Sequence, residues 1–150
     1  MEKQLRKEIR KILSGRTIRD QEGWLIAVPE GYQSLYQGVT DSTGYRKIKV
    51  KGKRRIRVAE NNEEAFFAVL NALQEVGELV NLQEKPDALC ALCRVLLTRR
   101  VLLCVEPEEG GSVLVQAYVG RSITSWICCR KVISKFVSKL EESQGRAHGE

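Results

Sequence analysis

The stretch "RVLLCVEPEEGGSVLVQAYVG", residues 100–120, decides the fold class of this 150-residue chain. Two apolar runs rich in β-branched residues flank the segment "PEEGG", whose proline and glycines are typical of a turn. This pattern predicts a β-hairpin over about residues 100–119. Since helical patterns lie on both sides of the hairpin, the sequence predicts an α+β fold with a small antiparallel sheet.

Three segments with apolar residues at helical spacing predict an N-terminal helix over residues 2–13, a central core helix over about 62–82 and a C-terminal helix over about 122–142. Asn61 stands just before the central helix and Glu64 follows three residues later, a pairing that resembles a capping box. The apolar positions are Leu5, Ile9, Ile12 and Leu13 in the first helix, Phe66, Val69, Leu70, Leu73, Val76 and Val80 in the second, and Trp126, Cys129, Ile133, Phe136 and Leu140 in the third.

Two further segments are assigned from their composition. The segment "ALCALCRVLLTRR", residues 88–100, is apolar nearly all round, which suits either a buried helix or a buried strand. We expect a helix that runs into a strand near Arg100. The segment "WLIAVP", residues 24–29, predicts a short strand, and residues 30–44 have the composition of turns with room for one more strand.

The most strongly charged segment is "YRKIKVKGKRRIRV", residues 45–58, which has eight basic side chains and no acidic one. Apolar residues occupy even positions and cations occupy odd ones on both sides of Gly52. Alternation with a period of two across a glycine predicts two strands joined by a turn, so we expect a basic hairpin over about residues 45–59. A loop of Gly52, Lys53 and Arg54 places Val50 opposite Ile56 and puts the odd-numbered cations on one face.

The charge is unevenly distributed along the chain, whose net charge is +6. Residues 1–60 contain 15 Lys and Arg against 7 Asp and Glu, whereas residues 61–150 contain 10 against 12. This asymmetry indicates an anionic partner for the N-terminal part. We therefore predict a small non-enzymatic nucleic-acid-binding protein that recognises the phosphate backbone of DNA or RNA. The predicted binding residues are Tyr45, Arg46, Lys47, Lys49, Lys51, Lys53, Arg55 and Arg57.

A protein-interaction module is the alternative function. In that case the basic hairpin docks an acidic partner, or the C-terminal helix self-associates, because its apolar positions alternate threes and fours as in a coiled coil. The same positions would also suit packing on the protein's own hairpin, so the chain is expected to be a monomer or a homodimer. The acidic loop residues Glu106, Glu108 and Glu109 could contact the basic hairpin and mask it.

Enzyme and metal-site patterns are sparse. The single histidine, His148, lies near the C-terminus, the three aspartates are far apart, and neither a phosphate-binding loop nor a nucleophile elbow occurs. We expect no catalysis and no cofactor. Cys90 and Cys93 have C-x-x-C spacing, but their apolar neighbours favour small buried side chains over zinc ligands. Cys128 falls on the lysine side of its helix, which predicts the most reactive thiol.

The length suits one α+β domain over residues 1–142, with a basic, β-rich part at 1–60 and a helical and hairpin part at 61–142. Residues 143–150 are expected to form a flexible tail. No apolar run is long enough to cross a bilayer, and the charged N-terminus does not resemble a secretory signal. With five cysteines, an odd number, the sequence favours a reducing, cytoplasmic compartment.

Overall fold

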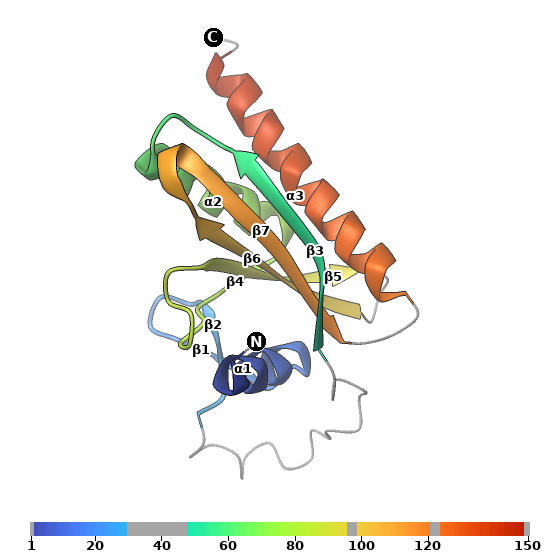
Figure 1. The fold of residues 1–150 in the computed structure, drawn as a ribbon. Helices are drawn as coiled ribbons and strands as arrows, with labels where there is room; N and C mark the ends of the chain where they lie inside the picture. Colours follow the sequence, from blue (N-terminus) through green and yellow to red (C-terminus); the bar gives the residue numbers. More distant parts are fainter. Residues whose placement is uncertain (1, 30–47, 96–98, 121–123, 149–150) are drawn as a thin grey trace.

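The computed structural model describes residues 2–29, 48–95, 99–120 and 124–148, with side chains at all of these except 48–53 and 143–148. It confirms the α+β class, with three helices and a seven-stranded, mostly antiparallel open sheet (Figure 1). In chain order the elements are α1 (Lys3–Leu13), β1 (Thr17–Arg19), β2 (Leu25–Ala27), β3 (Ile48–Arg57), α2 (Asn62–Val76), β4 (Glu78–Val80), β5 (Leu89–Val95), β6 (Arg99–Pro107), the 3-10 turn η3 (Glu109–Gly111), β7 (Ser112–Gly120) and α3 (Ser125–His148).

The strands follow one another across the sheet in the order β1-β2-β4-β5-β6-β7-β3. Only β2 and β4 run parallel, paired through Leu25 and Val80; the other neighbouring strands are antiparallel. The predicted hairpin of residues 100–119 is confirmed as β6 and β7. Its position near one side of the sheet leaves β3 as the last strand, so β3 and the much shorter β1 are the two edges.

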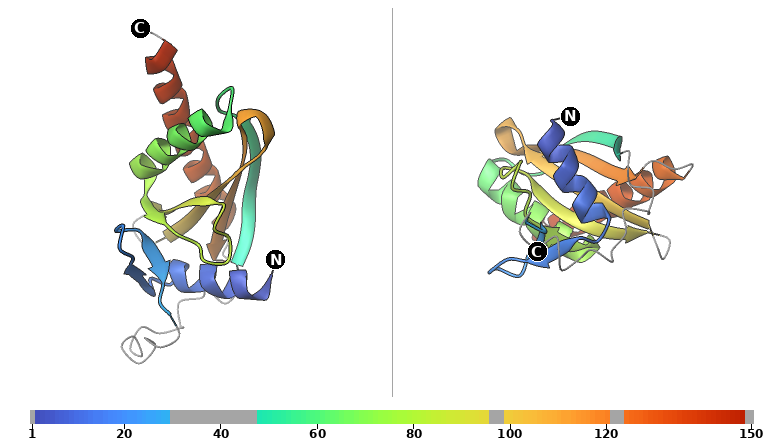
Figure 2. Two further views of the ribbon diagram at one scale, coloured as in Figure 1. Left: turned by 90° about the vertical axis from the view of Figure 1, so that its left-hand side faces the viewer. Right: turned by 90° about the horizontal axis from the view of Figure 1, so that it is seen from below.

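Helices cover both faces of the sheet. Alternate residues of β7, such as Val115 and Val119, enter a core that α2 and α3 close, whereas Tyr118 enters a second core beneath α1. This division follows from the alternation of side chains along a strand. Figure 2 shows α2 and α3 along the length of the sheet, while α1 lies across one end of it.

The central helix ends at Val76, earlier than the predicted end near residue 82. Its start is as expected, because the Asn61 side chain accepts a hydrogen bond from the backbone N–H of Glu64 at 2.9 Å. Gly77 allows the early end: a Cβ atom there would lie 2.5 Å from the carbonyl oxygen of Leu92 on β5. The chain can therefore turn directly from α2 into β4, where Val80 continues the helical spacing that predicts the longer helix.

The prediction of a helix within residues 88–98 is wrong, because Leu89–Val95 form β5. This strand lies inside the sheet and is covered on both faces: Cys90 belongs to the core under α1 and Cys93 to the core under α2 and α3. A strand buried on both faces has an apolar run without alternation. Its sequence therefore resembles that of a buried helix.

The C-terminal helix α3 continues to His148, past the predicted end at Glu142. Of the five predicted seam residues, Trp126 is 54% exposed, whereas the other four, Cys129, Ile133, Phe136 and Leu140, are buried in the chain's own core. Most of this seam is therefore already occupied and is not a free coiled-coil surface. Cys128 is also fully buried, and its predicted exposure on the lysine side is wrong. Because α3 packs against both the sheet and α2, its buried stripe is wide enough to include both adjacent cysteines.

Candidate nucleic-acid interface

The basic segment forms a single strand, and the predicted hairpin over residues 45–59 is wrong. Ile48–Arg57 make up β3, which pairs antiparallel with β7 along its whole length, from Ile48 opposite Gly120 to Arg57 opposite Ser112. A strand of ten residues is about 33 Å long. The cations of this segment are therefore distributed along one edge of the sheet rather than gathered on two short strands.

Gly52 lies beside a β-bulge and not in a turn. Val50 pairs with Tyr118 and Gly52 pairs with the adjacent Ala117, so Lys51 is the extra residue in β3. An isolated glycine inside an alternating pattern marks either a turn or a bulge, and the sequence does not distinguish the two. The bulge also shifts the alternation by one position. Lys49 pairs with Val119, whose side chain enters the core under α2 and α3, whereas Arg55 and Arg57 pair with Leu114 and Ser112, which belong to the other face of β7. The prediction that the odd-numbered cations share one face is therefore wrong.

Beyond the bulge, the arginines are accessible to solvent. Arg55 and Arg57 pair with Leu114 and Ser112, and both are exposed, as is Arg54 between Lys53 and Arg55. The neighbouring Ile56 is half-buried and packs against the core under α2 and α3. This part of β3 is held in place by its pairing with β7 and by the Ile56 side chain, and its guanidinium groups are in contact with water.

The other predicted binding residues are placed only in part. The backbones of Lys49, Lys51 and Lys53 belong to β3, and their side chains are outside the described set. Tyr45, Arg46 and Lys47 lie outside the described residues altogether. The β3 backbone and the side chains of Arg54, Arg55 and Arg57 therefore define the geometry of the candidate interface.

One acidic residue of the β6–β7 loop contacts the basic strand. The Arg55 Nε atom lies 3.1 Å from Oε1 of Glu108, and both side chains are partly exposed. Glu106 instead forms an ion pair with Lys85. Exposed ion pairs contribute about 0–1 kcal/mol. The predicted masking by the acidic loop is therefore present at a single arginine and is weak.

Helix α1 contributes to this surface, although the predicted binding residues include none of its cations. The exposed side of α1 carries Lys3, Arg6 and Lys7. The helix lies across the end of the sheet where β3 begins and contacts that strand (Figures 1 and 2). Two features of the sequence indicate this contribution, the strong amphipathicity of α1 and the positive charge balance of residues 1–60. The two most basic segments of the chain, separated in sequence, thus lie at the same end of β3.

Buried polar contacts hold α1 in this position. The Glu8 carboxylate accepts hydrogen bonds from the backbone N–H groups of Gln83 and Glu84 at 2.6 and 3.0 Å. The buried ammonium group of Lys11 donates to the carbonyl oxygen of Val28 at 3.1 Å. Because these anchors face the protein, the exposed cations of α1 project from a helix whose orientation is fixed.

The cysteines offer no comparable site. All five are buried and are thiols rather than disulfides. Burial, opposed by Lys135, raises the pKa of Cys93 to about 12. Burial and the hydrogen bond from the Cys90 thiol, 3.1 Å away, raise the pKa of Cys104 well above its usual value. Protonated thiols are poor nucleophiles and poor metal ligands. Within the described part of the chain, no three His, Cys, Asp or Glu residues are grouped so that they could hold a metal ion.

Comparison of the chain with models of protein families, with curated proteins and with solved structures finds no significant match. Among the described helices, none combines the length and the apolar character required to cross a membrane.

Proposed function

We propose that this protein is a non-enzymatic nucleic-acid-binding protein that contacts the phosphate backbone through β3 and α1. The observation that carries the proposal is the course of β3. It is an edge strand of ten residues with six basic side chains, and the helix α1, which carries exposed cations, lies at the end of the sheet where β3 begins. A polyanion lying along this edge meets cations over the full length of the sheet.

The spacing of the cations suits a repeating anion. Residues two apart on a strand are separated by about 6.8 Å. Arg55 and Arg57 have this spacing and are both exposed. The described surface provides charge without a set of side chains arranged to read base edges, so the binding is expected to be weakly dependent on sequence.

The salt dependence of binding is the quantitative signature. If about four to six phosphates are neutralised, log affinity falls with log salt concentration at a slope of about −4 to −5 for duplex DNA and about −3 to −4 for a single strand. Fluorescence anisotropy with labelled single- and double-stranded DNA and RNA, over a series of salt concentrations, measures this slope. Absence of binding at low salt, or an affinity independent of salt, would contradict the proposal.

A pair of matched variants tests the location of the site. The double variant Arg55→Gln/Arg57→Gln should bind more weakly and reduce the salt slope by about two. The control Arg130→Gln/Lys131→Gln removes the same charge from the exposed side of α3. Equal losses in the two variants would indicate a response to net charge and would refute a site on β3.

The contact between Arg55 and Glu108 gives a variant with the opposite sign. Glu108→Gln frees the guanidinium group and removes a negative charge from the proposed surface. Since an exposed ion pair contributes about 1 kcal/mol at most, nucleic-acid affinity should rise by no more than about fivefold. An unchanged or weaker affinity would place the bound polyanion away from Arg55.

An acidic protein partner is the second candidate, and the edge position of β3 favours it specifically. A free strand edge has unpaired backbone groups that an extended peptide can meet by strand addition, and the cations of β3 would attract acidic side chains. Polyglutamate distinguishes the candidates. If it binds more tightly than nucleic acid of equal charge and protects β3 amides from hydrogen exchange, strand addition is the better assignment.

A further inference from the structure

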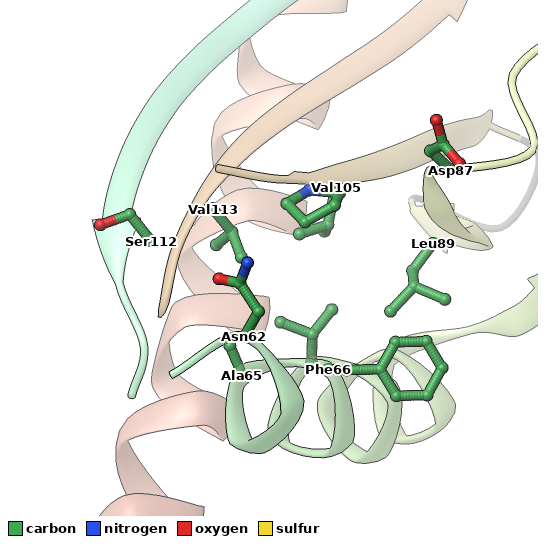
Figure 3. A pocket seen from close by; sticks show the side chains of 10 residues that line it. Asn62, Ala65, Phe66, Asp87, Leu89, Val105, Ser112 and Val113 are labelled. Carbon is green, nitrogen blue, oxygen red and sulfur yellow. The ribbon is translucent and has the colours of Figure 1, made fainter. Parts of the chain in front are cut away.

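A cavity of about 260 Å³ lies between the N-terminal half of α2 and the sheet. Figure 3 shows Phe66 and Leu89 on one side of it and Val105 and Val113 on the other. Ala65 and Val69 of α2 complete the apolar lining. At about 30 Å³ for each water-sized group, the cavity accommodates about nine non-hydrogen atoms. It is too small for most cofactors and suits a small apolar body.

Polar groups lie at the rim of this cavity. The Asn62 amide oxygen accepts the backbone N–H of Gly111 at 2.9 Å, and the Ser112 side chain points away from the cavity in Figure 3. Asp87 stands at the opposite side of the opening. Its carboxylate takes part in no hydrogen bond or ion pair with the described residues, and it is the one charged group among the ten residues that line the cavity.

We infer that this cavity binds a small amphiphilic cation, with its apolar body between Phe66 and Val113 and its ammonium group at Asp87. The unpaired carboxylate attracts a cation and repels an anion, and no basic residue lines the cavity to reverse that preference. An uncharged hydrocarbon would fill the apolar part and leave Asp87 unused. The inference is independent of the proposed nucleic-acid function, because none of the cations of β3 or α1 lines this cavity.

The test uses the full chain and three probes with a phenyl ring and a two-carbon linker. They are 2-phenylethylammonium, the neutral 2-phenylethanol and the anionic 3-phenylpropionate, titrated at constant ionic strength and followed by amide chemical shifts. We expect saturable shifts at the lining residues with an affinity in the millimolar range, as is usual for about nine atoms. Because Asp87 is exposed to solvent, the ammonium probe should bind up to about fivefold more tightly than the alcohol, and the carboxylate should bind most weakly.

Variants separate the charge from the apolar contact. Asp87→Asn should lower the affinity of the ammonium probe to that of the alcohol and leave the alcohol unaffected. Phe66→Ala should weaken all three probes, whereas Phe67→Ala, which removes an adjacent and more exposed ring that does not line the cavity, should weaken none. Circular dichroism checks that each variant folds.

Three outcomes overturn the inference. Shifts that do not saturate, or that map outside the cavity, exclude a site there. Equal affinity for the ammonium and the alcohol excludes recognition of a cation and favours an apolar side chain of a partner protein as the occupant. A loss in Asp87→Asn that is the same for all three probes assigns a structural role to this carboxylate.

Discussion

Removal of the Glu8 carboxylate is expected to loosen α1 from the sheet. Glu8 is 7% exposed and accepts two backbone N–H groups, from Gln83 and Glu84. Hydrogen bonds to a charged group contribute about 1.5–3 kcal/mol each. Because the site is at the border of the protein and water can reach part of it, the lower values apply. Glu8→Ala should therefore reduce the free energy of unfolding by about 3 kcal/mol.

Two further variants make this prediction specific. Glu8→Gln keeps one acceptor oxygen and should lose about half as much as Glu8→Ala. Gln4→Ala, at an exposed position of the same helix, should change the free energy of unfolding by less than about 0.5 kcal/mol. Urea denaturation followed by circular dichroism gives all three values. If Glu8→Ala loses no more than Gln4→Ala, the two hydrogen bonds do not hold α1 in place and the reasoning fails.

Three other perturbations have defined outcomes. Gly111→Ala should lower the free energy of unfolding, measured by urea denaturation, by about 3 kcal/mol or more, because φ is +79° and the new Cβ would lie 2.1 Å from the carbonyl oxygen of Ala59. Gly110→Ala should lower it by only about 1 kcal/mol, because φ is +68° but no atom lies within 4 Å of the new Cβ. Asn61→Ala removes the N-cap of α2 and should lower the free energy of unfolding by about 1 kcal/mol in the same assay. Burial raises the pKa of Cys93 from 9.0 to about 12, so the stability that comes from keeping this thiol protonated is complete below pH 9 and is lost as the pH rises to 12. Cys93→Ala should therefore flatten the alkaline decline in the free energy of unfolding, by up to about 4 kcal/mol over this range. An unchanged pH dependence in Cys93→Ala would disprove this prediction.

The elements with a one-sided amphipathic pattern could be predicted from the sequence. The α1 helix buries Ile9 and Ile12 as its spacing indicates. The β6–β7 hairpin lies where it is predicted, but its connection is residues 108–111, because Pro107 belongs to β6 and pairs with Val113. In α1 the local pattern and the tertiary environment agree, since one side of the helix faces a core and the other faces water. The hairpin strands are buried on both faces, so the proline and glycines between two β-branched runs identify the hairpin, and alternation does not.

Other elements could not be predicted, for two physical reasons. Strand β5 is buried on both faces, so the alternation that identifies a strand is absent, and the short strands β1 and β4 have too few residues to show any period. In β3 the alternation is present, but the pairing partner is not a local property. Nothing within residues 45–58 indicates that Gly52 sits at a bulge opposite Ala117 rather than in a turn.

Comparison of the two edges of the sheet shows that β3 carries more positive charge than protection against edge-to-edge pairing requires. Edges that could pair with another chain are protected by shortness, by lysines and by bulges. Strand β1 has only three residues and one arginine, Arg19, which pairs with Glu78 at 2.6 Å. Strand β3 has ten residues, a bulge and six cations. One or two lysines and the bulge would suffice against edge-to-edge association, and protection alone does not account for the exposed cations of α1, which contacts the same strand. The two roles also respond differently to mutation. If the cations only protect the edge, Arg55→Gln/Arg57→Gln should promote self-association and leave polyanion affinity equal to that of the α3 control. If the cations form a binding surface, the same double variant should stay monomeric and bind polyanions more weakly than the control.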